Sequence, residues 1–453
     1  MSKQTEFLFG NTENDTDLLL ALLKKARRLL VKKLSNNDRD WARFSNKHQA
    51  GVYIPHEQRD SGFFPELVSK ERADRETHEI REAIFTTLWP QMGNEQKSSR
   101  LVHYTSKGQE THLTRVPKAL FADLLPASFL IIGAIEDGRD LKFECLTIDS
   151  GSDDAVYLAE LLDIGPDFLV DIFDPSAAIE AERGRILDFA DQVISAWMAG
   201  DISSFATANA SMPATADLAL IARTKYMQRC GRRDLNPFEI ENPGDALRDI
   251  SRGIEWDLFR DFQRRERAVA LVRLVMGDAP VEIGAAKVIR SLVDALPEID
   301  RLMLSASQQR KSRAGYSYEH HIEAMLRDGS VPFEKQVIIE KRKRPDFVLP
   351  SLAFLNGKSS QAGTGLILSA KTTLRERWKQ VEREKGQRDL FLTTVDENIA
   401  GNAIEDMASF GVCLVIPESL KRADESEYKK HKNVLSFREF CDDVIKPRID
   451  LWG

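Results

Sequence analysis

Short apolar runs separated by turn-forming residues mark the first part of the chain. Runs of this length with polar boundaries are typical of strands. The predicted strands cover 51–55, 101–104, 129–135, 141–148 and 168–173. Two other segments have helical periodicity: a basic amphipathic segment over 17–33, and a second segment near 75–88. The pattern therefore predicts a small β-rich domain, mixed or barrel-like, on the N-terminal side.

Helical periodicity dominates the middle of the chain, over 216–230, 245–276 and 285–306. Beyond it, helices and strands alternate. The predicted helices are 318–327, 375–385 and 400–410, and the predicted strands are 336–340, 346–349, 365–370, 390–395 and 412–416. Strands that alternate with helices indicate an α/β layered core. The last apolar segment, 437–452, is interpreted as a helix that packs on this core.

The stretch of lowest complexity, 200–215 (GDISSFATANASMPAT), is small and polar with one proline. Such a composition is typical of an interdomain linker. A chain of 453 residues is long enough for two or three domains. We therefore predict an N-terminal domain over 1–199, a linker over 200–215 and a C-terminal domain over 216–453.

The charge of the chain is segregated along its length. Sixty-four Lys and Arg against 71 Asp and Glu give a net charge of −7, and the stretch 136–182 is strongly acidic. Basic residues cluster at 24–33, 260–273, 310–313 and 341–344. Each cluster alone could be a solvated helix face. Because the local field rather than the net charge decides binding, several such clusters indicate an anionic polymer as partner.

Composition also argues against several classes of protein. No uncharged apolar run reaches the roughly 18 residues of a membrane span, and the first residues lack the apolar region of a signal peptide. The four cysteines lie far apart, without the spacing of a zinc site. These features predict a cytoplasmic protein with reduced thiols, no membrane association and no structural zinc.

Two charged residues stand at the ends of predicted strands in the α/β part. Asp346 follows a turn and begins one strand, and Lys371 directly follows the apolar strand 365–370. In a nuclease core, an aspartate binds a divalent metal while a lysine orients or deprotonates the attacking water. The hard-oxygen shell of Mg²⁺ needs a further carboxylate, but Ser369 occupies the position two residues before Lys371. Taken alone, this match to a PD-(D/E)xK site is incomplete.

The missing carboxylate can come from the following predicted helix. Glu384 lies thirteen residues beyond Lys371 and shares a helix face with Arg377. Glu382 is the alternative, although it lies about 160° around the helix from Glu384. Glu319 on the helix 318–327 could supply another carboxylate, or could be an ordinary surface glutamate.

Three segments closely resemble the catalytic domain of EcoRII-type restriction endonucleases. They are 312–319 (SRAGYSYE), 344–351 (RPDFVLPS) and 371–380 (KTTLRERWKQ), and the resemblance extends over about 215–420. It implies a restriction-endonuclease-like PD-(D/E)xK α/β core whose glutamate is displaced onto the helix. It further implies that Asp346, Lys371 and Glu384 are catalytic, with Asp346 and Glu384 holding Mg²⁺ and Glu319 as an auxiliary.

The triplet Arg375, Glu376 and Arg377 follows the lysine closely. Guanidinium groups bind guanine O6 and N7, and a carboxylate accepts from cytosine N4. The resemblance implies that this triplet contacts the bases of a CC…GG site, whereas intrahelical salt bridges are the structural alternative. Arg252 and Trp256, four apart on a helix, resemble the pair with which relatives hold a flipped-out base. A tryptophan at this spacing can equally belong to the core.

The N-terminal part resembles the effector-binding domain of the same family, a B3-like pseudobarrel. The matching segments are 34–38 (LSNND) and 48–55 (HQAGVYIP). The resemblance implies that His48 and Tyr53 contact effector DNA. It also implies that Glu95, Lys97 and Arg100, set in a loop, form the recognition element, although this loop is less basic and spaced differently.

The resulting prediction is a two-domain, Mg²⁺-dependent type II restriction endonuclease. It would cut double-stranded DNA as a homodimer and be stimulated by a second site, with a cognate cytosine DNA methyltransferase as its genetic partner. Two alternatives stay open: a repair or mobile-element nuclease of low sequence specificity, and a non-catalytic DNA-binding regulator with a decayed nuclease core.

Overall fold

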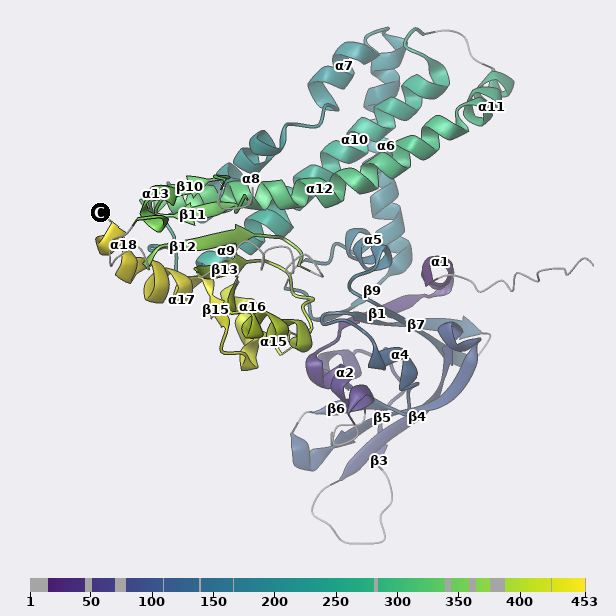
Figure 1. The fold of residues 1–453 in the computed structure, drawn as a ribbon. Coiled ribbons are helices and arrows are strands. Elements are labelled where there is room, and N and C mark those ends of the chain that lie inside the picture. Colours follow the sequence, from purple (N-terminus) through teal and green to yellow (C-terminus); the bar gives the residue numbers. More distant parts are fainter. Residues whose placement is uncertain are drawn as a thin grey trace, which may run out of the picture. The chain divides into compact units, whose positions relative to one another are not determined.

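The computed structural model describes most of the chain (Figure 1). The described residues are 15–44, 51–69, 79–108, 110–137, 140–165, 167–280, 284–338, 344–357, 364–374, 388–424 and 426–452. The chain divides into two compact units, unit 1 up to Ala181 and unit 2 from Glu182. Among the described residues, no helix combines the length and the apolar character that crossing a membrane requires.

Unit 1 is built on a sheet of nine strands in the order β2-β6-β5-β4-β8-β7-β1-β9, with β3 paired to β4. Neighbouring strands are antiparallel except for the parallel pair β4 and β8. The strands are β1 (Arg28–Lys33), β2 (Val52–Ile54), β3 (Val68–Ser69), β4 (Ile80–Trp89), β5 (Glu95–Tyr104), β6 (Thr111–Thr114), β7 (Phe129–Asp137), β8 (Asp140–Ile148) and β9 (Val170–Phe173). The five strands that the sequence predicts in this part are thus confirmed.

Two apolar clusters pack on this sheet. One contains Trp89, Phe121 and Phe143. The other joins Leu19 and Leu22 of a helix to the sheet. The helices and short turns of the unit are α1 (Asp15–Lys25), α2 (Asn36–Arg43), α3 (His56–Arg59), η1 (Pro90–Met92), η2 (Thr105–Lys107), α4 (Ala119–Ala122) and α5 (Asp153–Leu161).

Two helix predictions for this unit are wrong. The predicted helix 17–33 ends at Lys25, and its second half is β1, which lies between β7 and β9. Residues 29–33 are all buried there, and Lys32 forms an ion pair with Asp38 at 3.1 Å. The apolar and basic residues of this segment look like the two faces of an amphipathic helix, but they belong to a strand that is buried on both sides. The predicted helix 75–88 is likewise a strand from Ile80 onward, because ten residues of β4 pair in register with β5.

The helices of unit 2 lead into its sheet. They are α6 (Pro175–Met198, which begins in unit 1), α7 (Ile202–Asn209), α8 (Thr215–Cys230), α9 (Pro243–Arg248), the π-helix η3 (Asp249–Ile254), α10 (Glu255–Met276), α11 (Ala285–Asp294) and α12 (Leu296–Asp328). The predicted helical stretches of the middle part are thus confirmed.

The linker predicted over 200–215 is wrong, because half of it forms α7. Ile202 is fully buried, and Ala210 is 3% exposed. Both belong to an apolar cluster with Val193, Trp197 and Val269, within unit 2. Small residues with a proline suggested a flexible chain, but Ile202 and Ala210 anchor the segment, although Ser203, Ser204, Thr207 and Ala208 are exposed. The division between the units consequently falls 18 residues before the predicted end of the N-terminal domain at 199.

The α/β core of unit 2 is a six-stranded sheet in the order β10-β11-β12-β13-β14-β15. The first three strands are antiparallel, and β12 to β15 are parallel. The strands are β10 (Glu334–Lys335), β11 (Phe347–Leu349), β12 (Leu366–Ala370), β13 (Asp389–Thr393), β14 (Val412–Ile416) and β15 (Val434–Ser436). Four of the five predicted strands are confirmed. The strand predicted over 336–340 is instead the short β10, and 339–343 lie outside the described residues.

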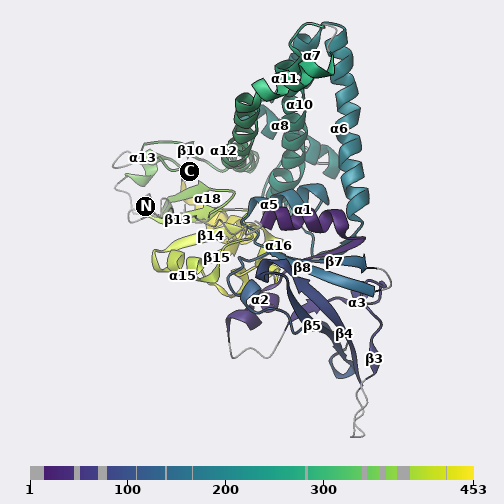
Figure 2. The same ribbon diagram turned by 90° about the vertical axis from the view of Figure 1, so that its right-hand side faces the viewer.

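Helices cover both faces of this sheet. Leu366 and Leu368 pack in a cluster with Tyr318 of α12, whereas Ile367 packs in a second cluster with Ile404. Figure 2 shows α15 and α16 beside β14 and β15. The remaining helical elements are α13 (Leu352–Leu355), α15 (Gly401–Ser409), α16 (Glu418–Arg422), η6 (Tyr428–Lys430), α17 (Phe437–Glu439), η7 (Phe440–Ile445) and α18 (Lys446–Trp452). The last three form the predicted packing segment.

Candidate active site

Asp346 and Lys371 meet at one edge of the unit 2 sheet. Asp346 directly precedes β11 and Lys371 directly follows β12, and these two strands are antiparallel neighbours with Phe347 opposite Leu368. Lys371 Nζ donates a hydrogen bond to Asp346 Oδ2 at 2.7 Å, and the backbone N–H of Ala370 donates to the same oxygen at 2.8 Å. The adjacent ends of β11 and β12 therefore hold a carboxylate and an ammonium group in fixed contact.

Glu319 is the second carboxylate at this edge. It lies on α12 beside Tyr318, whose hydroxyl is 2.8 Å from Thr393 Oγ1 at the end of β13. Burial and the nearby Asp346 carboxylate raise the pKa of Glu319 to about 7, and Lys371 acts in the opposite direction. Since both side chains act on this pKa, Glu319 lies within electrostatic range of Asp346 and Lys371, two of the other residues predicted to be catalytic.

The donor set suits a hard cation. Two carboxylates supply oxygen ligands of the kind that Mg²⁺ prefers, and Asp346 disfavours the charged form of Glu319, an excess of negative charge that a bound cation would relieve. Ser369 is buried, with 1% of its surface exposed, and offers no carboxylate. Within the described residues, no group of three His, Cys, Asp or Glu side chains could hold a metal ion. Glu384, the predicted second ligand, lies outside the described residues, as do Arg375, Glu376 and Arg377.

Arg252 and Trp256 lie on the continuous helical segment formed by η3 and α10. The Arg252 guanidinium donates to the carbonyl of Val395 at 3.4 Å and is 3.8 Å from a carboxylate oxygen of Glu397. The Trp256 ring stacks on Phe259 with centroids 5.9 Å apart and is only partly buried. Both side chains are thus held on the catalytic unit.

Three of the residues predicted to bind effector DNA lie in a different type of element from the predicted one. Glu95, Lys97 and Arg100 do not lie in a loop but in β5, because ten residues here pair in register with β4. Lys97 pairs with Glu95 at 2.6 Å, and Arg100 donates to Glu82 at 2.6 Å. Their ion pairs lie along a regular strand rather than a recognition loop.

Tyr53 lies in β2, where its backbone N–H donates to Asp38 Oδ1 at 2.7 Å. Lys32 Nζ lies 5.6 Å from the centre of the Tyr53 ring, and the His112 ring packs against it edge-on at 6.0 Å. This aromatic side chain is therefore partly buried and fixed in place. His48 lies outside the described residues.

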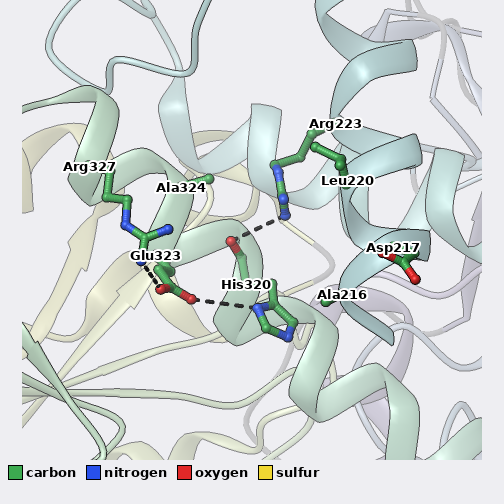
Figure 3. Close-up of a pocket in the computed structure, with 8 residues that line it drawn as sticks. All are labelled: Ala216, Asp217, Leu220, Arg223, His320, Glu323, Ala324 and Arg327. Atoms are coloured by element: carbon green, nitrogen blue, oxygen red, sulfur yellow. Dashed lines mark hydrogen bonds and ion pairs between the residues drawn. The ribbon is translucent and has the colours of Figure 1, made fainter. Parts of the chain in front are cut away.

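A separate hollow of about 350 Å³ lies between α8 and the end of α12 (Figure 3). It contains none of the predicted site residues. Glu323 there binds Arg327 at 2.6 Å and lies 3.5 Å from His320, while Arg223 donates to the His320 carbonyl at 3.2 Å. Burial lowers the pKa of His320. The Glu323 carboxylate in this hollow is thus held by Arg327 and His320.

Sequence reasoning did not single out Asp396, which is 2% exposed and follows β13. Its carboxylate binds the backbone N–H of Leu374, three residues beyond Lys371. A carboxylate shortly after a buried strand was the available signal, but the partner 22 residues earlier is visible only in the fold.

Comparison with known proteins finds similar restriction enzymes. The EcoRII C-terminal family matches residues 282–441. The type II restriction enzyme EcoRII of Escherichia coli is 26% identical over 411 residues, covering 86% of this chain and 88% of the relative. The type II restriction enzyme SsoII of Shigella sonnei is 26% identical over 221 residues, 46% of this chain and 70% of the relative.

A solved structure of metal-depleted Ecl18kI in complex with uncleaved DNA is 22% identical, with a TM-score of 0.45, over 59% of this chain and 86% of that one. The matched family segment contains both Asp346 and Lys371. The family match and the two curated relatives support an EcoRII-type restriction endonuclease.

Proposed function

We propose that this restriction endonuclease cuts both strands of DNA at a CC…GG-type site in a Mg²⁺-dependent reaction. The observation that carries the proposal is the contact of Lys371 Nζ with Asp346 Oδ2 at 2.7 Å, at a strand edge that also holds Glu319. Asp346 and Glu384 would hold the metal, which supplies positive charge for the phosphate and leaving oxygens when bound. Lys371 would orient the attacking water, and Glu319 would be an auxiliary carboxylate.

Digestion of a large phage DNA tests this function directly. With Mg²⁺ we expect discrete fragments whose ends define a CC…GG-type site, and with EDTA we expect intact DNA. A smear would instead favour a nuclease of low sequence specificity. Intact DNA under all conditions, even with added CC…GG oligonucleotides, would contradict catalysis and favour a DNA-binding regulator.

Base reading is assigned to the triplet that follows the lysine. Arg375 and Arg377 would donate to guanines, and Glu376 would accept from cytosine N4, as these side chains do in the major groove. The support for this assignment is the chemistry of the triplet and its short distance in sequence from Lys371.

Arg252 and Trp256 are proposed to hold a base flipped out of the centre of the site. Their partly exposed side chains, on the same helical segment, support this role. Stacking on an aromatic side chain is worth about 1–3 kcal/mol per base and would offset part of the cost of unstacking.

Replacing Trp256 by alanine is therefore expected to remove most of the fluorescence increase of a 2-aminopurine placed at the centre of the site. Loss of the stacking surface should also weaken DNA binding by about 1–3 kcal/mol. Fluorescence titration of the labelled duplex measures both effects. Phe410→Ala is the control, since Phe410 is an exposed aromatic residue in the same unit. An unchanged fluorescence increase in Trp256→Ala would contradict the base-flipping role. Trp256 would then serve only to pack on Phe259.

Unit 1 is proposed to be a B3-like domain that binds a second copy of the target as effector. His48 and Tyr53 would contact this DNA together with Glu95, Lys97 and Arg100, now as residues of a strand. The support is the similarity to EcoRII over 86% of the chain, more than unit 2 alone can account for. The enzyme would act in the cytoplasm as a homodimer in which each subunit cuts one strand. A cognate cytosine DNA methyltransferase would protect the host DNA.

A further inference from the structure

The segment that follows Lys371 is tied at successive points to the segment that follows β13. The backbone N–H of Lys371 donates to the carbonyl of Thr393 at 3.0 Å. Thr394 Oγ1 then donates to the carbonyl of Thr372 at 3.5 Å. Finally, the backbone N–H of Leu374 donates to Asp396 Oδ2 at 2.8 Å. The main chain from the catalytic lysine to Leu374 thus follows a neighbouring strand beyond the end of the sheet.

Asp396 contributes the charged part of this connection. Its other carboxylate oxygen accepts from the N–H of Asn398 at 2.9 Å, which closes a local turn, and its own N–H donates to Thr394 Oγ1 at 3.0 Å. Burial raises the pKa of Asp396, while the Arg252 guanidinium and the two backbone N–H groups oppose this rise. The buried Tyr428 hydroxyl donates to the Asp396 carbonyl. The turn is therefore fixed from several directions.

The same turn holds Arg252. Its guanidinium donates to the Val395 carbonyl at 3.4 Å and lies 3.8 Å from Glu397, the residues on either side of Asp396. Glu397 in turn binds Arg248 at 3.1 Å, and both of these side chains are largely buried. One short turn thus contacts both the flank of the catalytic lysine and the proposed base-flipping arginine.

We propose that Asp396 is a positioning residue for DNA cleavage, whose buried carboxylate fixes the main chain beyond Lys371 and orders the turn that holds Arg252. This inference rests on the proposed function. Charge-assisted hydrogen bonds to backbone N–H groups are stronger than neutral ones, so a carboxylate suits this task. Asparagine at this position would place an amide N–H₂ against one of the two N–H donors that the carboxylate satisfies.

The test measures single-turnover cleavage and DNA affinity of Asp396→Asn in the full chain with saturating Mg²⁺. A shift of about 1 Å at a reacting group can cost about 100-fold in rate. We expect cleavage to slow by about 10- to 100-fold, with the dissociation constant for DNA changed far less. Thr394→Val is the second variant, because it is nearly isosteric and removes the neighbouring contact to Thr372 without changing a charge. Thr394→Val should also slow cleavage.

Glu418→Gln is the matched control. Glu418 is also a buried carboxylate of unit 2, and it accepts from the backbone N–H groups of Gly244, Asp245 and Arg438 at 3.3, 2.9 and 2.8 Å. Its replacement should lower the unfolding temperature but leave the cleavage rate near that of the wild type, when each protein is assayed well below its unfolding midpoint.

Two results would overturn the inference while the proposed function stands. The first is a wild-type cleavage rate in both Asp396→Asn and Thr394→Val. The second is an equal loss of rate in Asp396→Asn and Glu418→Gln, which would make Asp396 a contributor to stability only. A wild-type protein that cuts no DNA would overturn the proposed function, and this inference with it.

Discussion

Replacing Lys371 by alanine is expected to lower the rate of DNA cleavage by about 10³-fold, with little loss of DNA binding. The ammonium group lies 2.7 Å from Asp346 Oδ2, and in the proposed reaction it would orient the attacking water. Groups that orient a nucleophile or stabilise developing charge contribute about 10²- to 10⁴-fold each. Alanine removes the donor but leaves β12 intact. Single-turnover cleavage of a duplex with a CC…GG site, and its binding without Mg²⁺, separate the two effects.

Lys421→Ala is the control for this prediction. The Lys421 side chain is 25% exposed and the Lys371 side chain 27%, and each lysine forms an ion pair, Lys421 with Glu439 and Lys371 with Asp346. Loss of a partly exposed ion pair should cost at most about 1 kcal/mol of stability and leave cleavage unchanged. A Lys371→Ala protein that cuts DNA at the rate of Lys421→Ala would refute the assignment of this site.

The strands that carry the site could be predicted closely because their side chains are apolar on both faces. All five residues of β12 and four of the five in β14 are buried, so each reads as a short apolar run with polar ends. Asp346 and Lys371 then stand out as charged residues at the ends of such strands. Their mutual contact at 2.7 Å depends on the antiparallel pairing of β11 with β12, which the sequence analysis did not predict.

The failures have a common physical origin in tertiary contacts. Residues 29–33 form a strand because β7 and β9 flank them, and no property of the segment alone reveals those neighbours. The stretch 200–215 has the composition of a linker, yet Ile202 is buried by helices on either side of it in the sequence. Asp396 escaped notice for the same reason, since its role depends on a backbone N–H that lies 22 residues away.

Truncation of a buried phenylalanine in the core of one unit should destabilise that unit and leave the other unchanged. Phe440 is fully buried in unit 2, with its ring 4.9 Å from that of Phe391 and 6.0 Å from that of Phe437. Phe143 is 1% exposed in unit 1 and lies 4.8 Å from the ring of Phe85. Truncation of a buried phenylalanine to alanine costs about 3–5 kcal/mol, because apolar contacts are lost and a cavity remains.

Hydrogen exchange resolved by peptide should therefore show opposite patterns in the two variants. Phe440→Ala should reduce protection within residues 182–453 and leave the sheet of unit 1 as in the wild type, whereas Phe143→Ala should do the reverse. Each variant serves as the control for the other, since the substitution and the burial are matched. Equal loss of protection in both units from either variant would mean that they unfold as one cooperative body. The division between Ala181 and Glu182 would then mark a difference in packing, and no boundary between independently unfolding units.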